Sequence, residues 1–135
     1  MATLRLEIVT PEACAYSDDV DSVVIPAAEG EMGVFPMHVP VMTQIKPGEL
    51  VVKKGSETLH LAVGDGFVEV TQWRVNVLTD MAIDAKQIDE KAAQDAVARA
   101  QEKLRTGALG HEEVAAVQSA LQKSMAQLHV KRRRH

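Results

Sequence analysis

Residues 59–77 read LHLAVGDGFVEVTQWRVNV, and this stretch decides the fold class. Its apolar side chains fall on every second position of three short runs: Leu59, Leu61 and Val63; Val68 and Val70; Val75 and Val77. A period of two is typical of a β-strand that buries one face. Two turn segments, Gly64–Gly66 and Gln72–Trp73, separate the runs. Short strands joined by such turns predict an antiparallel sheet.

The same pattern extends toward the N-terminus, through Leu4, Leu6 and Ile8, then Val23–Ile25, and then Leu50–Val52 with a turn at 53–56. No helical pattern interrupts these runs, which favours a β-sandwich or barrel over a parallel α/β sheet. We therefore predict an antiparallel β-sandwich or barrel domain over residues 1–84. His60 alternates with apolar neighbours, so we expect its ring to face solvent.

The periodicity changes near residue 84. Asp84, followed three residues later by Gln87, resembles a capping box at a helix start. Steps of three, four or one then place one apolar helix face at Ile88, Ala92, Ala96, Val97, Ala100 and Leu104. Residues 106–110 break this helix, and a second stripe follows at Val114, Val117, Leu121, Met125 and Leu128. A short loop between two helices predicts an antiparallel hairpin over residues 85–135.

The predicted hairpin has narrow apolar stripes, and the first consists mainly of alanine. Alanine contacts stabilise weakly, since burial contributes roughly 25 cal/mol per Å² of apolar area. Two arrangements are compatible with this pattern: a hairpin that docks and undocks, and a helix pair packed permanently on the sandwich.

Charge is divided unevenly along the chain. Residues 1–84 carry 13 acids and 5 bases, a net charge of −8, whereas residues 85–135 carry 6 acids and 10 bases, a net charge of +4. This asymmetry suggests two modules with different partners. The basic end at Lys131–Arg134 has no aromatic interleaving and no second basic patch, so we expect a solvated helix end or a contact with an acidic protein surface. No nucleic-acid partner is expected.

Catalytic and metal-binding motifs are missing from the sequence. There is no phosphate-binding glycine loop, no GxSxG and no HExxH, the five histidines lack metal-ligand spacing, and Cys14 is the single cysteine. We predict no catalytic residue, no metal and no cofactor. No apolar run approaches the roughly 20 residues that span a bilayer. The N-terminus alternates polar and apolar residues, unlike a signal peptide, so we expect a mature, cytosolic chain.

One longer motif carries a family resemblance. The segment from Gly30 to Gly48, GEMGVFPMHVPVMTQIKPG, resembles the signature of the epsilon subunits of bacterial F-type ATP synthases, with a Gly-x-x-Gly-x-x-x-x-His-x-Pro core and a closing Ile-Lys-Pro-Gly turn. The stretches 66–70 and 75–80 resemble the last strands of that family. The resemblance implies a ten-stranded antiparallel β-sandwich followed by a two-helix antiparallel hairpin.

The resemblance also implies a function. Family members are rotor subunits of the central stalk of a proton-translocating synthase, peripheral on the cytoplasmic side of the cell (inner) membrane. They bind the gamma subunit and the c-subunit ring, and have no active site of their own. By position, the resemblance assigns Glu29, Gly30, Glu31 and Met32 to the c ring, and His38, Val41 and Met42 to gamma. An acidic loop suits basic c-ring loops, because complementary charge sets register.

The C-terminal hairpin is the regulatory element of the family. Folded down it permits turnover, and extended into the alpha/beta catalytic head it restrains ATP hydrolysis. From the basic balance of this module we expect contacts to acidic surface of the head from Arg99, Arg105, Lys123, Arg132, Arg133 and Arg134.

Some family members bind ATP in the down state through Ile-Asp-x-x-Arg-Ala. This chain has Ile88, Asp89, Ala92 and Ala93 at those positions, so the arginine is replaced by Ala92. The loss removes a charge-assisted phosphate contact, and we predict weak or absent ATP binding.

Two other functions compete with the rotor subunit. One is an autonomous enzyme that uses His38 with an acidic partner such as Glu31, and the other is a sandwich-type protein-binding module with a detachable helix pair outside the synthase. Co-purification with gamma separates the rotor subunit from both.

Overall fold

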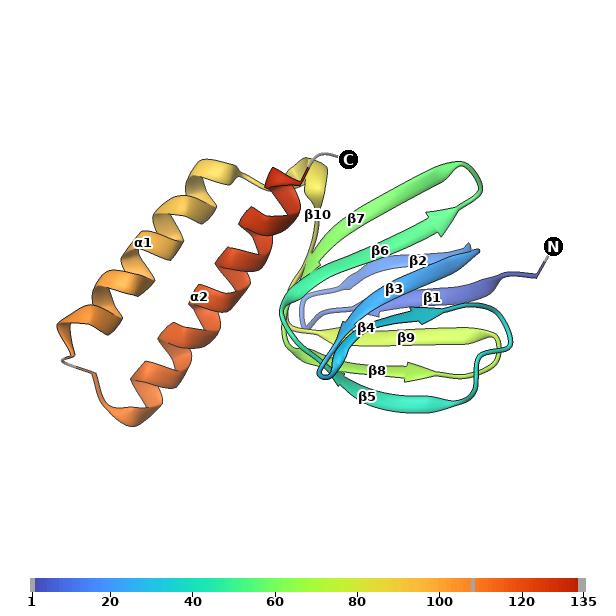
Figure 1. Cartoon of the computed structure of the whole chain (residues 1–135), viewed down its shortest axis with the longest axis horizontal. Coiled ribbons are helices and arrows are strands. Elements are labelled where there is room, and N and C mark those ends of the chain that lie inside the picture. Colours follow the sequence, from blue (N-terminus) through green and yellow to red (C-terminus); the bar gives the residue numbers. More distant parts are fainter. Residues whose placement is uncertain (1, 108, 134–135) are drawn as a thin grey trace.

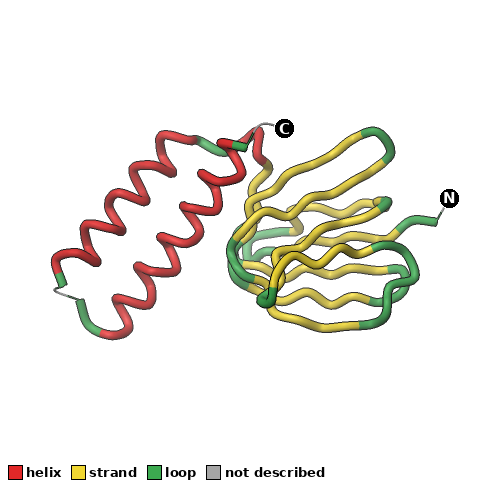
Figure 2. Tube along the Cα trace, in the orientation of Figure 1, coloured by secondary structure: helices red, strands yellow, loops and turns green. Residues whose placement is uncertain are grey.

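Ten strands precede two helices along the chain (Figures 1 and 2). The computed structural model describes residues 2–107 and 109–133. The strands are β1 (Leu4–Val9), β2 (Cys14–Val20), β3 (Ser22–Ala27), β4 (Gly30–Val34), β5 (Val41–Ile45), β6 (Gly48–Lys54), β7 (Glu57–Val63), β8 (Gly66–Val70), β9 (Arg74–Thr79) and β10 (Ala82–Asp84). A 3₁₀ turn, η1 (Ala85–Gln87), leads to helices α1 (Glu90–Thr106) and α2 (His111–Arg132). The predicted sandwich with a C-terminal helix pair is confirmed.

The strands follow the order β10-β7-β6-β3-β5-β8-β9-β1-β2, and β4 pairs with β3. Strands β3 and β5 share one residue pair, Ala27 with Ile45, so the sheet folds there into two layers. One pairing departs from the antiparallel pattern, because β1 runs parallel to β9 with Leu6 opposite Val75. Parallel strands need a long connection, and here strands β2 to β8 form the part of the chain that connects β1 to β9.

The core lies between the two layers and is built from the period-two positions. Its largest fully buried side chains come from both layers and are Leu4, Leu6, Ile8, Ile25, Ile45, Leu50, Val20, Val23, Val34, Val52, Val63 and Val68. Because successive side chains of a strand point to opposite faces, the same alternation leaves a second row of residues on the outside. That outer row supplies the surfaces described below.

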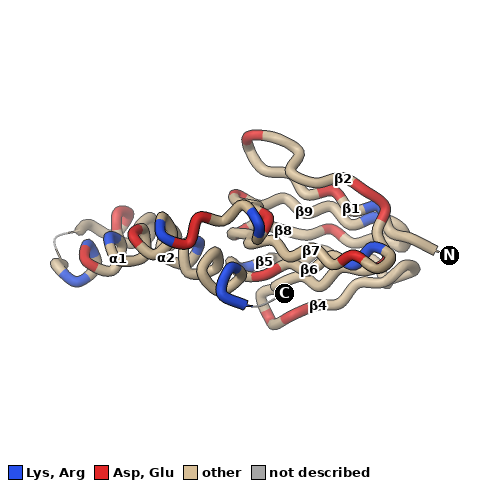
Figure 3. Tube along the Cα trace, turned by 90° about the horizontal axis from the view of Figure 1, so that it is seen from above, with Lys and Arg blue, Asp and Glu red and all other residues tan. Residues whose placement is uncertain are grey.

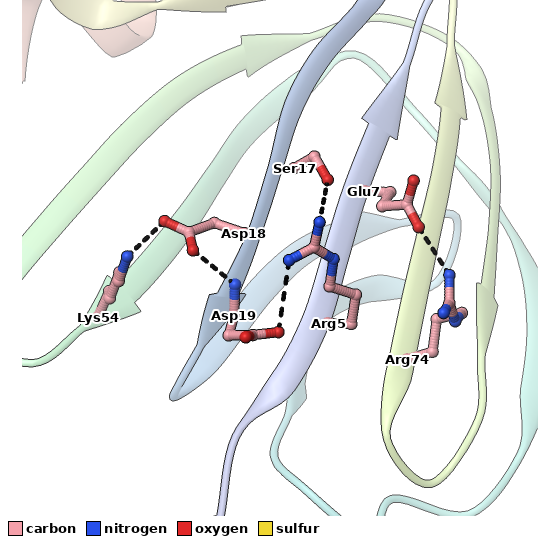
Figure 4. A network of polar contacts seen from close by, with 7 residues as sticks. All are labelled: Arg5, Glu7, Ser17, Asp18, Asp19, Lys54 and Arg74. Atoms are coloured by element: carbon pink, nitrogen blue, oxygen red, sulfur yellow. Dashed lines mark hydrogen bonds and ion pairs between the residues drawn. The ribbon is translucent and has the colours of Figure 1, made fainter.

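Polar contacts join the edge strand β2 and the residue that follows it, Asp21, to the end of β6. The Asp21 amide donates to the Lys53 carbonyl at 2.8 Å, and the Gly55 amide donates to the Asp21 carboxylate at 2.7 Å. Lys54 on β6 pairs with Asp18 on β2, as Figure 4 shows. The edge strand β2 is thereby tied to the opposite layer, which protects it from pairing with other chains.

The helical module begins later than the predicted capping box. Asp84 accepts from the Lys86 amide at 2.8 Å and caps only the 3₁₀ turn η1, whereas Asp89 accepts from the Ala92 amide at 3.0 Å and caps α1. The residue between them, Ile88, has extended backbone angles (φ −75°, ψ 126°) and is buried. Burial of Ile88 against the sandwich interrupts the helix, so the predicted start at Asp84 is wrong. At the other end of α1, Gly107 has φ +68°, a left-handed cap.

The hairpin is docked, and α2 lies between α1 and the sandwich (Figure 1). Val114, Val117, Leu121 and Leu128 are half-buried, as expected for the predicted stripe, but Met125 is 46% exposed. Ala126 and Val130 are more deeply buried, with 6% and 0% exposure, although the prediction omitted both. On α1 the buried residues are Ala93 and Ala100, and Ala92 is exposed rather than on the predicted face.

Candidate functional site

The turn between β3 and β4 holds the predicted c-ring contact. Glu29 and Glu31 are exposed, Gly30 and Met32 are half-buried, and Gly30 has φ +131°. Backbone hydrogen bonds of 2.9 Å on either side of the turn, Ala28 N to Gln44 O and Lys46 N to Pro26 O, fix it to the end of β5. The turn lies at the end of the sandwich nearest the helices (Figure 1). The β3–β4 turn therefore presents two exposed carboxylates, and its backbone is fixed to the end of β5.

Glu31 also faces a groove shared with the docked hairpin. This groove, of about 340 Å³, is lined by Glu31, Lys46 and Glu49 of the sandwich and by residues of α2 that include Gln122, His129 and Arg133. The predicted c-ring surface and the docked hairpin are thus neighbours.

The loop between β4 and β5 holds the predicted gamma contact. His38 is half-buried, and its Nδ1 lies 2.7 Å from the Val39 carbonyl oxygen. Met37 has φ +68°, and its amide donates to the Gln72 carbonyl at 2.6 Å, which fastens the loop to the β8–β9 turn. Val41 and Met42 follow on β5, with 36% and 67% exposure. This loop lies at the end of the sandwich opposite the β3–β4 turn (Figure 1), so the two predicted contact sets form separate surfaces.

Exposed apolar side chains that the sequence analysis did not single out surround His38. Phe35, Met37, Val39 and Trp73 are 63%, 65%, 75% and 48% exposed. Exposed apolar side chains gathered in one place mark binding surfaces. The sequence contained part of this signal, because the β4–β5 loop has three large apolar residues, Phe35, Met37 and Val39, where a solvent-facing loop would carry polar ones.

A second apolar row crosses the outer face of β8, β9 and β1. Phe67 pairs with Leu78, and Leu78 pairs with Val9, with exposures of 57%, 54% and 40%. Both Phe67 and Leu78 interrupt the alternation of apolar and polar residues in their strands. On the same face lie the polar contacts Glu7–Arg74 at 2.7 Å and Arg5–Asp19 at 3.6 Å (Figure 4).

The predicted regulatory cations differ in their surroundings. Arg99 is exposed on α1, and Arg105 pairs with Glu102 of the same helix. By contrast, the cations at and near the end of α2 form ion pairs with other elements. Lys123 lies 2.9 Å from Asp80 in the β9–β10 connection, Arg132 lies 3.0 Å from Glu90 of α1, and Arg133 pairs with Glu49 of β6. Arg134 lies outside the described residues. Figure 3 shows Lys and Arg at the C-terminal end of α2, which lies close to the sandwich.

His60 is covered rather than solvent-facing, so that prediction is wrong. It points out of the sandwich core, as the alternation requires, but its side chain is 17% exposed. Its Nδ1 lies 3.2 Å from Glu49 Oε2, and the Glu49 side chain is 4% exposed. The docked hairpin covers this outer face, because α2 packs on β6 and β7.

The side chains of the degenerate ATP motif do not face one common site. Ile88 is buried beneath the hairpin, Asp89 caps α1, Ala92 is exposed and Ala93 is buried. The Asp89 carboxylate already accepts a backbone amide, and no cation stands at position 92.

The structure does not assemble the catalytic pair considered from the sequence. Within residues 2–107 and 109–133, no ion pair or hydrogen bond joins Glu31 to His38, and no group of three potential metal ligands occurs. The pKa of Asp18 is lowered by the hydrogen bond from Lys54, whose own pKa is raised by the same bond. Burial raises the pKa of nearby Tyr16. These three pKa shifts belong to residues of β2 and β6. No helix in the described part of the chain is long and apolar enough to cross a membrane.

Comparisons with known proteins agree with this architecture. Residues 3–85 match the family model of the ATP synthase delta/epsilon chain beta-sandwich domain, and residues 86–132 match that of its long alpha-helix domain. The chain is 42% identical to an ATP synthase epsilon chain of Dehalococcoides mccartyi, with 100% of this chain and 98% of the relative covered. It is 45% identical to the epsilon chain of Desulforamulus reducens over 76% of this chain and 77% of that one.

Solved structures share the fold. A chain of the Euglena gracilis mitochondrial ATP synthase superposes with a TM-score of 0.78 at 23% identity, covering 93% of this chain and 79% of that one. A chain of the Tetrahymena thermophila mitochondrial ATP synthase central stalk and c ring has a TM-score of 0.57 at 11% identity, covering 95% and 92%. With both modules matched along almost their whole length, the chain belongs to the ATP synthase delta/epsilon chain family.

Proposed function

We propose that the chain is a non-catalytic rotor subunit in the central stalk of a proton-translocating F-type ATP synthase, peripheral on the cytoplasmic side of the cell membrane. It couples c-ring rotation to the catalytic head through gamma. One observation carries this proposal. The sandwich has two separate exposed surfaces, the acidic β3–β4 turn and the apolar loop around His38, at its opposite ends. A subunit that bridges two partners needs two such surfaces.

In this proposal the c ring meets Glu29, Gly30, Glu31 and Met32, where carboxylates suit basic loops. Gamma meets His38, Val41 and Met42, and the neighbouring Phe35, Met37, Val39 and Trp73 extend that contact. Membrane association is indirect, through the assembled complex.

A crosslink tests the c-ring contact in the assembled synthase. Glu31→Cys, in a Cys14→Ser background, is expected to crosslink to a cysteine in the c-ring loop. Glu57→Cys is the matched control, since Glu57 is also an exposed acid but lies beside the β6–β7 turn. An intact assembly in which position 31 does not crosslink, or in which position 57 crosslinks equally well, contradicts the proposed contact. Failure to co-purify with gamma would favour the binding module outside the synthase.

The hairpin is the regulatory element of this proposal. Docked, it permits turnover, and extended, its cations bind acidic surface of the alpha/beta head and restrain ATP hydrolysis. Support comes from α2, whose cations are held by carboxylates of the sandwich and of α1 in the docked state. Deletion of residues 111–135 is expected to relieve inhibition of ATP hydrolysis in the complex. Unchanged inhibition after this deletion would contradict the regulatory role.

A further inference from the structure

The last turns of α2 are held by a series of polar contacts that end at Arg133. Lys131 Nζ donates to the Ala85 carbonyl at 3.2 Å, Arg132 pairs with Glu90, and Arg133 pairs with Glu49. The carboxylates differ in their surroundings. Asp80, which pairs with Lys123 earlier in α2, and Glu90 have side chains that are 38% and 47% exposed. The side chain of Glu49 is only 4% exposed. The Glu49–Arg133 pair is therefore the most buried of these contacts on its acidic side.

The burial of Glu49 involves the hairpin itself. Glu49 pairs in register with Ala62 on β7, and Ala62 packs in one cluster with Val130 of α2. Glu49 also lines the groove that Ala126, His129 and Arg133 border from the α2 side. Docking of α2 thus removes the Glu49 carboxylate from water. One oxygen then receives Arg133, and the other lies 3.2 Å from His60 Nδ1.

A carboxylate taken out of water is costly unless a cation accompanies it. Docking therefore buries a charge whose guanidinium partner comes with the docking helix. Removal of the guanidinium alone leaves the carboxylate to be buried without it, which is worse than removing both charges. The pair thus makes the docked state dependent on the basic end of α2, in addition to the apolar contacts of Val130.

We propose that Glu49 is an electrostatic lock that makes docking of the hairpin conditional on Arg133. An acidic protein surface that binds the C-terminal arginines and draws Arg133 away from Glu49 then weakens docking, because Glu49 loses that guanidinium. The identity of that surface as the catalytic head rests on the proposed function, but the lock itself does not.

The lock is tested on the full chain by distance measurement between two spin labels. In a Cys14→Ser background, labels at Ser56→Cys and Thr106→Cys report the separation of sandwich and hairpin, since both positions are exposed. Arg133→Gln is expected to lower the ratio of docked to released chains about tenfold, the scale of coupling between contacting charged residues. Glu49→Gln added to Arg133→Gln is expected to restore most of the docked population. Arg105→Gln, whose partner Glu102 is on the same helix, is the control and leaves the ratio unchanged.

Two results would overturn the lock: an Arg133→Gln chain as fully docked as the wild type, or a double variant as fully released as Arg133→Gln alone. Arg133 lies at the end of α2, so its loss leaves the sandwich core intact. Polyglutamate at constant ionic strength probes the competition and is expected to release the wild-type hairpin. A docked population that polyglutamate does not alter would overturn the competition. None of these readouts depends on a c ring or gamma, so they fail independently of the c-ring crosslink.

Discussion

The side chain of Val130, near the end of α2, packs in one buried cluster with Ile88, the residue between η1 and α1. Val130 has 0% exposure and Ile88 has 5%. The first and last parts of the hairpin therefore meet at the same place on the sandwich, against Ala62 of β7. The C-terminal end of α1 and the N-terminal end of α2 lie far from this point (Figure 1).

Truncation of Val130 should loosen the base of the hairpin. Val130→Ala removes buried apolar volume at this junction, and we expect a loss of about 2 kcal/mol from the transfer and cavity terms. Urea unfolding followed by far-ultraviolet circular dichroism measures it. Val39→Ala is the control, because Val39 is 75% exposed, and its stability should be unchanged. Equal effects of the two substitutions would show that Val130 does not hold the hairpin.

Gly66 should resist even the smallest side chain. A Cβ at this position would lie 1.8 Å from the Leu78 carbonyl oxygen and 2.8 Å from Thr79 Cα, both in the backbone of β9. We expect Gly66→Ala to destabilise the sandwich by about 3 kcal/mol, the upper end for overpacking. At Gly33 the nearest atom is 3.8 Å away, at the tip of Phe35, so Gly33→Ala is the matched control. Comparable denaturation midpoints for the two variants would contradict the close approach of β8 and β9.

The Asp18–Lys54 pair should make stability depend on pH at both extremes. The pKa of Asp18 is lowered in the folded chain, so its contribution is present above the unfolded pKa of about 3.9 and is lost as pH falls through the folded value. The pKa of Lys54 is raised, so its contribution is present below about 10.4 and is lost as pH rises through the folded value. Denaturation midpoints of Asp18→Asn should therefore fall less steeply than those of the wild type below about pH 4. Asp95→Asn, on exposed α1, should follow the wild type.

The sandwich was predictable because its signal is local. Alternation in runs such as 4–8 and 59–63 follows directly from one buried strand face, and the structure buries Leu4, Leu6 and Ile8 completely. The parallel pairing of β1 with β9 was not predictable in this way, since it joins segments about 70 positions apart and alternation does not specify a partner. The start of α1 was misplaced because Asp84 and Asp89 are both good caps. Burial of Ile88, a tertiary contact, decides between them.

The surfaces were only partly predictable. The motif from Gly30 to Gly48 located the acidic turn and His38, but not the exposed Trp73, which reaches that end of the sandwich from another strand connection. Ala126 and Val130 were missed because the predicted apolar stripe of α2 already satisfied the helical period. A helix that packs between two neighbours, as α2 does, buries a second face, and these two residues lie on it. His60 was misjudged for a related reason, since alternation identifies the outer face of a strand but not what covers it.

The degenerate ATP motif should leave the isolated chain without strong nucleotide binding. Asp89 accepts the Ala92 amide as a helix cap, and the exposed Ala92 supplies no cation to a phosphate. Isothermal titration of the wild-type chain with ATP should give no saturable heat at micromolar concentration. Ala92→Arg restores a guanidinium at an exposed position one turn into α1, where it can form a charge-assisted phosphate contact, and should raise ATP affinity by about tenfold or more. Ala98→Arg, also exposed on α1, is the control for added charge. Micromolar binding by the wild type, or equal gains from both arginines, would show that position 92 does not limit ATP binding.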